Sequence, residues 1–459
     1  MRIKVKIEAV VNLEEGKTNI NEITETIGNW SRQVGLDVCK GVIENYQEKI
    51  VDLLCDGKGE SSWVPHKDKR EDSEQLCPSD SFRRGGFRKK ERVLKTPMGE
   101  LRVKVRQIIC KICDKRFEVL SPLLKMPKYS RATMKIKQMS TETVGELSYR
   151  RSDERIEGLA KIDIPKSTLH RWTTAGEWDV FTEWANSEDI WKSFTGIMAD
   201  GTGYKRQKAK TTKGNLRIVM GVKDGCPKLV PLGVWADKSW EEIEKKISGD
   251  KPPGIKPDVL TVDGEKGQER LSNLTGNIQR CSWHVPHQLK YYLWKDGVPK
   301  NVGGEFIRQL LGIIKIEVPQ EDYKEITDAM KEEIQENLKK SRGSVNELIA
   351  AFKGKGYEGA STYLENAAEH MFTVVDKWLE IGYMPPKTIS ILERTMREMG
   401  RRLKKIGASW KEKGVLAVAN ILLARIYTPE QWEKYWDKLL DIQGRCSISS
   451  YHIKCSVVP

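Results

Sequence analysis

The spacing of apolar residues divides the first part of the chain into segments of different predicted structure. Residues 3–11 alternate apolar and charged side chains, which predicts a β-strand. Across residues 21–54 the apolar positions recur every third or fourth residue, which predicts a helix. The polar stretch 56–81 predicts a loop. Residues 92–109 alternate again around a Pro97–Gly99 turn, so we expect a basic β-hairpin there.

Residues 149–174 carry the pattern of a helix-turn-helix. Ile156, Leu159 and Ala160 give the first helix an apolar stripe, and residues 161–164 form a short turn. Pro165 suits the first turn of a second helix, where its missing N–H costs nothing. With Leu169 and Trp172 facing inward, the outward positions are polar or basic, as in a helix that reads a DNA groove: Lys166, Ser167, His170 and Arg171.

From Ser193 the pattern becomes α/β. Helices are expected at 239–247 and 266–274, among five strands. The predicted strands are Phe194–Asp200, Leu216–Val222, Leu229–Trp235, Val259–Asp263 and Ile278–Trp283. Three strands in succession, then helix, strand, helix and strand, is the order expected of an RNase H-like domain.

The segment that follows is wholly helical. Amphipathic runs at 306–316, 323–338, 345–352 and 363–381 fill residues 301–385, which we interpret as an insertion into the sheet domain. The α/β pattern does not resume. Two helices joined near 407–414 are expected over 389–427.

These patterns predict an α/β fold whose RNase H-like mixed sheet is interrupted by an all-helical insertion. DNA-binding regions precede the sheet. The predicted division is 1–75, an N-terminal strand and helical region; 76–125, a basic hairpin resembling a degenerate zinc ribbon; 126–185, a helix-turn-helix; 186–300, the first part of the catalytic core; 301–385, the insertion; 386–440, the C-terminal helices of the core; and 441–459, a tail.

Size and composition set the class of protein. At 459 residues, two to four domains are expected. The apolar stretch Val415–Ala424 is about half of what a membrane span requires, and no secretory signal pattern is visible at the N-terminus. Nine cysteines, mostly isolated, favour a reducing compartment over a disulfide framework. We therefore expect a cytoplasmic, nucleoid-associated protein with no membrane partner.

The net charge of +14 points to a polyanionic partner, and its distribution is uneven. Between Arg83 and Arg116 there are thirteen Lys and Arg residues against three acids. A merely solvated surface would mix the two signs, so contact with the DNA backbone is the better interpretation. The residues expected to contact phosphates are Arg83, Arg84, Lys89 and Lys90, together with Arg401 and Arg402 of a late basic helix.

A Cys-x-x-Cys pair, Cys110 and Cys113, follows the basic hairpin and resembles half of a zinc ribbon. The second half would be Cys77 and Asp80, an uncommon ligand set in which Cys55 or His66 could replace the aspartate. Two interpretations remain open: a bound structural zinc, and a knuckle that has lost its metal.

Two aspartates, Asp200 and Asp263, each end a predicted strand and precede a glycine. Taken singly, an Asp-Gly pair after a strand is usually a turn. Taken together, they predict carboxylates side by side on neighbouring strands, which repel unless a cation lies between them. Glu393 could supply a third ligand from the start of a basic helix. Glu398 and Glu412 are the alternatives to it.

These acids, the sequence ILERTMREMGRRLKKIG around Glu393, and a Cys-x-x-His pair after the second aspartate resemble prokaryotic insertion-sequence DDE transposases of the Mutator-like type. The resemblance covers residues 193–427. It implies that Asp200, Asp263 and Glu393 are catalytic and bind two Mg²⁺ (or Mn²⁺) ions about 3.5–4 Å apart. It also implies that Cys281 and His284 form a buried pair near the active site.

The activity implied by the resemblance is DNA cleavage at element ends and strand transfer into a target. The partners would be double-stranded DNA, at the inverted-repeat ends and in the target, and further copies of the chain on that DNA. Two other classes stay open, a helix-turn-helix DNA-binding protein and a catalytically inactive descendant of a transposase.

Overall fold

A computed structural model describes residues 3–7, 9–12, 19–56, 77, 81–126, 130–207, 212–223, 229–319, 326–441 and 447–448. The chain divides into two compact units. The first comprises Met1–Trp172 with Leu439–Pro459, and the second comprises Thr173–Lys438.

The first helix of the first unit is long, α1 (Ile20–Cys55), and it confirms the helix predicted over residues 21–54. The Asn19 side chain accepts hydrogen bonds from the first-turn N–H groups, and the Glu22 carboxylate accepts one from the Asn19 N–H, which fixes where the helix begins. The predicted strand over residues 3–11 is wrong, because residues 3–7 and 9–12 form no strand. This segment lies along α1, where Val5 and Ile7 remain about half exposed, and it pairs with none of the described strands.

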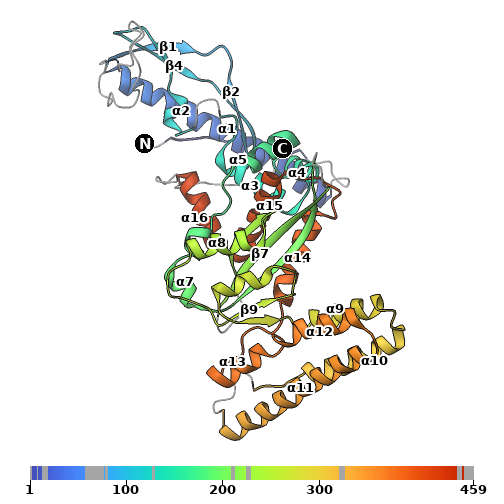
Figure 1. The fold of residues 1–459 in the computed structure, drawn as a ribbon. Helices are drawn as coiled ribbons and strands as arrows, with labels where there is room; N and C mark the ends of the chain where they lie inside the picture. Colours follow the sequence, from blue (N-terminus) through green and yellow to red (C-terminus); the bar gives the residue numbers. More distant parts are fainter. Residues whose placement is uncertain are drawn as a thin grey trace. The chain divides into compact units, whose positions relative to one another are not determined.

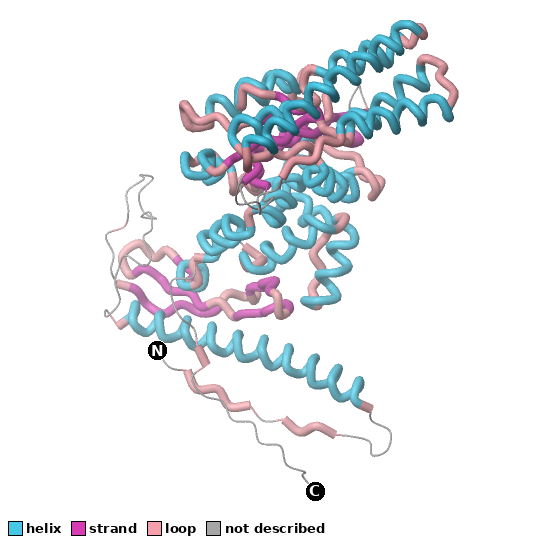
Figure 2. Tube along the Cα trace, turned by 90° about the horizontal axis from the view of Figure 1, so that it is seen from below, coloured by secondary structure: helices cyan, strands magenta, loops and turns pink. Residues whose placement is uncertain are grey.

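The strands of the first unit form two small sheets beside α1 (Figure 2). The predicted hairpin is present as β2 (Arg92–Thr96) and β3 (Gly99–Val103), but it ends earlier than expected. Residues Arg106–Cys110 form a separate strand, β4, which lies between β1 (Phe82–Phe87) and β5 (Arg116–Glu118).

Short helices complete this unit: α2 (Leu120–Leu123), α3 (Met134–Glu146), α4 (Tyr149–Ala160) and α5 (Lys166–Ala175), the last of which runs into the second unit. The predicted helix–turn–helix outline is present, with α4 ending at Lys161 in the left-handed conformation. Leu159 was expected to face inward and is instead 56% exposed. The buried face of α4 consists of Ser152, Ile156 and Ala160, at a strict four-residue spacing.

The second unit is built on a five-stranded mixed sheet with the order β10-β9-β6-β7-β8. The strands are β6 (Phe194–Lys205), β7 (Lys213–Lys223), β8 (Leu229–Ala236), β9 (Val259–Val262) and β10 (Ile278–Arg280). Strands β6, β7 and β8 pair antiparallel, whereas β6, β9 and β10 pair parallel. All five predicted strands are therefore confirmed. Three bounds differ from the prediction by three residues or more. β6 runs on past Asp200 to Lys205, and β7 begins at Lys213 instead of Leu216, because the two strands stay paired over this stretch. β10 ends at Arg280 instead of Trp283.

Helices cover both faces of this sheet. Ile197 and Ala199 of β6 lie in a core with α8 (Trp240–Asp250) and the 3-10 helix η2 (Gln268–Leu274). The opposite face is covered by α14 (Ser390–Leu403), which packs on β6, and α15 (Glu412–Tyr427), which packs on β8. Burial on this face explains the apolar stretch in α15. The remaining helices around the sheet are α6 (Thr182–Ala185), α7 (Glu188–Lys192) and α16 (Pro429–Leu440).

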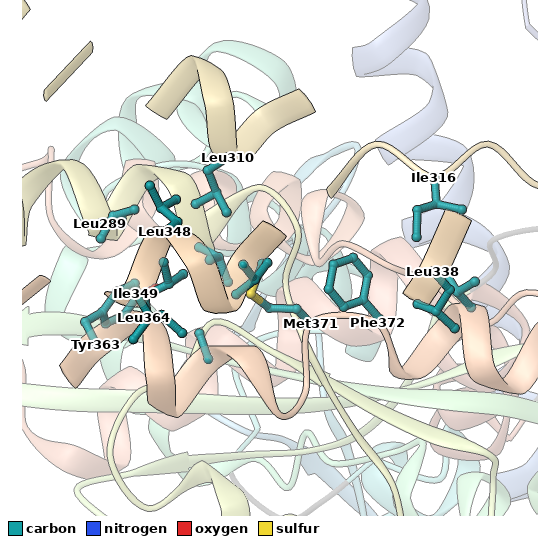
Figure 3. Close-up of a cluster of buried hydrophobic side chains, with 14 of the residues drawn as sticks. Leu289, Leu310, Ile316, Leu338, Leu348, Ile349, Tyr363, Leu364, Met371 and Phe372 are labelled. Carbon is teal, nitrogen blue, oxygen red and sulfur yellow. The ribbon is translucent and has the colours of Figure 1, made fainter. Parts of the chain in front are cut away.

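A helical block follows β10 and is drawn yellow to orange beside β9 in Figure 1. It consists of α9 (His284–Lys295), α10 (Lys300–Ile314), α11 (Asp328–Gly354), α12 (Glu358–Ala368) and α13 (Thr373–Ile381). Its core draws on all these helices (Figure 3). The block begins at His284 rather than at 301, because α9 packs on α10 and α12. Two predicted runs, 323–338 and 345–352, merge into α11, and the run 363–381 is divided between α12 and α13.

The edge strand β10 is held by this block. The Arg280 N–H donates to the His370 carbonyl at 2.8 Å, and the buried Gln279 amide bonds the Met371 carbonyl and the Val374 N–H. Pairing with this segment protects an otherwise open sheet edge and joins the block to the strand next to the acids.

Candidate functional site

Asp200 and Asp263 lie at the same level of the sheet. The last paired residues of the parallel strands β6 and β9 are Ala199 and Val262, and each aspartate is the next residue along its strand. Neighbouring strands are about 4.8 Å apart, so the two backbones are adjacent. Because successive side chains alternate, and Ala199 and Val262 face α8, both aspartates point to the face that α14 covers.

Glu393 lies in the first turn of α14, where its N–H donates to the Ile389 carbonyl at 2.9 Å. A carboxylate is favoured at this end of a helix because the free N–H groups carry partial positive charge. The apolar face of α14, with Leu392, Met396 and Met399 buried, packs on the sheet. This packing directs the start of the helix toward the two aspartates.

The pKa of Asp200 is shifted by the acids that lie near it. Burial, followed by the charges of Asp263, Glu393 and Glu265, raises the pKa of Asp200 from 3.8 to about 7, while a 2.7 Å hydrogen bond from the Gly201 N–H opposes the rise. Neither alternative to Glu393 is among these charges: Glu398 pairs with Arg401 at 3.0 Å, and Glu412 is exposed at the start of α15. The structure thus brings Asp200, Asp263 and Glu393 together.

The start of α14 is tied to the sheet by three polar contacts. The Thr261 hydroxyl donates to the Pro386 carbonyl at 2.6 Å, and the Ser282 N–H donates to the Lys387 carbonyl at 3.0 Å. Cys281 is fully buried, and its thiol accepts a hydrogen bond from the Ile389 N–H. Burial raises the pKa of this thiol, so it remains protonated and serves a structural role.

His284, the first residue of α9, lies beside the acid cluster. Its Nε2 lies 3.4 Å from Glu393 Oε1. Burial lowers the pKa of His284, and the charges of Asp263 and Glu393 oppose that shift. The expected Cys-x-x-His pair therefore lies beside the acids. Cys281 connects the segment between β10 and α9 to the start of α14, and His284 contacts Glu393.

Three further residues at the site were not predicted. Glu265 forms an ion pair with Arg217 of β7, and its N–H donates to Asp263 Oδ1 at 3.0 Å. The Arg280 guanidinium fills the space beside Gly264, whose φ of +93° and lack of a Cβ allow that approach. The Asp-Gly-Glu sequence could have identified Glu265 as a second acid at the turn. Nothing in the local sequence identifies Arg217 or Arg280, which reach the turn from other strands.

The site offers hard carboxylate oxygens from three elements, the ligand type that Mg²⁺ and Mn²⁺ prefer. The three carboxylates do not have ligand atoms all within 4.8 Å of one another; within the described ranges, only a thiol cluster does.

The thiol cluster consists of Cys77, Cys110 and Cys113, all buried in the first unit. The Cys110 sulfur is 3.9 Å from that of Cys77, and it accepts hydrogen bonds from the N–H groups of Ile112 at 3.4 Å and Cys113 at 3.5 Å. Such N–H···S bonds stabilise a thiolate, the form that binds zinc. Cys55 packs beside the cluster but is not among its ligands. Asp80 and His66 lie outside the described residues.

The residues predicted to contact DNA differ in their exposure and in the ion pairs they form. Lys166, Ser167, His170 and Arg171 are exposed on α5, and Lys89 and Lys90 are exposed between β1 and β2. Arg83 and Arg84 are also exposed, although each pairs with acids of the same unit: Arg83 with Asp114, and Arg84 with Glu48 and Asp52. Arg401 is exposed and pairs with Glu398.

Arg402 requires a correction. It was expected to contact the DNA backbone, but it is only 1% exposed. It lies on the inner face of α14, with its guanidinium carbon 5.0 Å from the centre of the Trp410 ring. The ring face and the helix packing stabilise the cation away from the surface.

Comparisons with known proteins add little to this geometry. No protein-family model matches the chain, and no curated protein matches it. Among solved structures, the chain is similar to the Drosophila P element transposase strand transfer complex, with 13% identity over 68% of this chain and 83% of that chain. The TM-score is 0.27. Within the described ranges, the helices are too short or too polar to cross a membrane.

Proposed function

We propose that the chain is a DDE-type DNA transposase whose five-stranded sheet is an RNase H-like catalytic core. The observation that carries the proposal is the convergence of Asp200 and Asp263, level on adjacent parallel strands, with Glu393 on the helix that covers them. Clustered, partly buried carboxylates repel one another and destabilise the fold unless cations lie between them. A cluster of this kind is consistent with a metal site that acts on phosphodiesters.

In this proposal Asp200, Asp263 and Glu393 hold two Mg²⁺ or Mn²⁺ ions, which supply activation of the attacking oxygen and stabilisation of the departing one. The chain's own residues position that site. The contacts from Thr261 and Cys281 fix the start of α14, and the Arg217–Glu265 pair braces the turn after Asp263. The substrate would be double-stranded DNA at the ends of a mobile element, with transfer to a target by further copies of the chain.

The alternatives fit the observations less well. A helix-turn-helix DNA-binding protein would use α5 and the basic first unit, but would leave the acid cluster without a role. An inactive transposase descendant would have no need to keep three acids together against their repulsion.

Two variants on one helix test the proposal. Glu393→Gln should abolish Mg²⁺-dependent cleavage of duplexes that carry the DNA ends flanking the gene. Glu398→Gln, five residues further along α14 and paired with Arg401, should cleave like the unmodified chain. Mn²⁺ should replace Mg²⁺, whereas Ca²⁺ should support binding without cleavage because it tolerates looser geometry. If Glu393→Gln cleaved DNA as well as Glu398→Gln does, Glu393 would not be a catalytic residue.

A further inference from the structure

We infer that the outer face of α9 is a stacking platform for unpaired nucleotides of the DNA strand that enters the acid site. This rests on the proposed function for the location of the substrate. The platform consists of Trp283, His287, Tyr291 and Trp294, with Lys290 and Lys295 between and beside the rings.

The rings form an exposed stripe along one side of α9. Trp283 is 52% exposed, Tyr291 55% and Trp294 70%. Their spacing of four, eight and eleven residues from Trp283 keeps them on one side of the helix, over roughly 16 Å at 1.5 Å per residue. The other side of α9 is fully used, since Val285, Leu289 and Leu293 are buried in the helical block, where Figure 3 shows Leu289. The core therefore gives no reason for aromatic residues on the outer side.

The geometry and charge of the stripe suit bases better than an apolar partner. The Trp283 and His287 rings are stacked at 4.9 Å with an interplanar angle of 15°, and Tyr291 and Trp294 lie 5.9 Å apart. From His284 to Lys295 the helix carries no acid, so Lys290 and Lys295 leave the face positive. Flat rings alternating with cations are the combination that binds single-stranded nucleic acid, since each base stacks and each phosphate meets a positive charge.

The stripe begins at the acid cluster. Trp283 precedes His284, whose Nε2 is 3.4 Å from Glu393 Oε1. An open hollow beside Trp283 and Lys290 is also lined by Leu311 of α10 and by Thr388, which lies just before α14. A strand with its scissile phosphate at the acids would therefore pass onto these rings, provided its bases were unpaired.

The test is the affinity of the full chain for labelled oligonucleotides in EDTA, so that a failure of cleavage cannot affect the result. Trp294→Ala should weaken binding of single-stranded DNA by roughly 5- to 150-fold, the range for removal of one stacked base. Duplex binding should remain unchanged, and Trp294→Phe should restore the affinity. Trp30→Ala is the control, because Trp30 is an exposed tryptophan of a different helix, α1, with 42% of its surface exposed.

Three outcomes would overturn the inference. An equal drop in affinity for single-stranded and duplex DNA would mean general backbone attraction without stacking. An equal drop for Trp30→Ala would mean that α9 has no special role. If Trp294→Ala changed the oligomeric state measured by sedimentation but left DNA affinity intact, the face would be an interface between copies of the chain.

Discussion

At the residue scale, Asp200 carries the clearest chemical signature of the site. Burial and the charges of Asp263, Glu393 and Glu265 raise its pKa to about 7, so at lower pH the folded chain keeps a proton there. In the unfolded chain the carboxyl ionises near 3.8. The unfolded state therefore binds fewer protons than the folded state between these values, and stability falls as pH rises through the window.

Asp200→Asn should remove this pH dependence. Without metal, the variant should gain melting temperature relative to the unmodified chain as pH rises from about 4 to about 7, and the difference should then level off. Adding Mg²⁺ at about pH 8 should raise the melting temperature of the unmodified chain only, because binding stabilises the folded state. The measurement is thermal unfolding in EDTA and in Mg²⁺ across this range. If the difference in melting temperature between the two proteins did not vary with pH, the pKa of Asp200 would not be raised by its surroundings.

From the sequence, motifs located the three acids that the structure brings together, but they did not reveal which basic side chain would be buried. Asp200, Asp263 and Glu393 were identified by strand ends and a basic helix, and the structure brings them together. Arg402 belongs to the same basic helix, yet it is buried over Trp410, a residue in the connection to the next helix. A run of basic residues in the sequence does not show which of their side chains will be buried against an aromatic ring.

At the element scale, the start of α14 is the feature on which the site depends. Glu393 and the two aspartates lie on segments far apart in the sequence, and the acids with the largest effect on the pKa of Asp200 all lie outside the helical block between them. The sequence could predict each element from its periodicity, but not that contacts at residues 386–389 would hold α14 in place. For the same reason the strand expected at residues 3–11 does not form in the described part of that segment: alternation cannot supply a pairing partner.

Thr261→Val tests the role of this contact. It removes the hydroxyl that bonds the Pro386 carbonyl while keeping the side-chain shape. Turnover should fall about 10- to 100-fold, as when a group that orients a metal ligand is removed, with DNA affinity unchanged. The cost in stability should be about 1 kcal/mol. Thr275→Val is the matched control, because Thr275 is also buried and bonds the Asn277 carbonyl away from the acids. An equal fall in turnover for both variants would reflect general destabilisation.

The thiol cluster is a second element-scale feature, and we propose that it binds a structural zinc. Purified protein should contain zinc, and Cys113→Ser should lose it and melt at a lower temperature, because structural zinc contributes directly to folding. Cys55→Ser should keep its zinc, since Cys55 packs beside the cluster without joining it. Metal analysis and thermal unfolding measure both effects. A zinc-free protein that melts like the Cys113→Ser variant would support the degenerate knuckle.

At the scale of the whole molecule, the proposed function gives positive charge two different tasks. The first unit carries the dense basic segment between Arg83 and Arg116, whereas the outer positions of α5 combine charge with hydrogen-bonding groups. Phosphate contacts add affinity for any DNA, and base contacts add discrimination. Within the basic segment, Arg83 and Arg84 already pair with acids, whereas Lys89 and Lys90 are exposed. We therefore expect the two lysines to contribute more to phosphate binding than the two arginines.

Binding measured over a series of salt concentrations should separate these tasks. Neutralising Lys89 and Lys90 should reduce the slope of log affinity against log salt by about 0.9 for each phosphate that the variant no longer neutralises, equally on element ends and random duplexes. Neutralising Arg83 and Arg84 should reduce it less, since their paired acids already offset part of their charge. Arg171→Ala should instead cost roughly 1–3 kcal/mol on element ends only, because each base contact has about that value. An equal cost on both DNAs for Arg171→Ala would make residues 149–174 a packing element and move end recognition elsewhere in the chain.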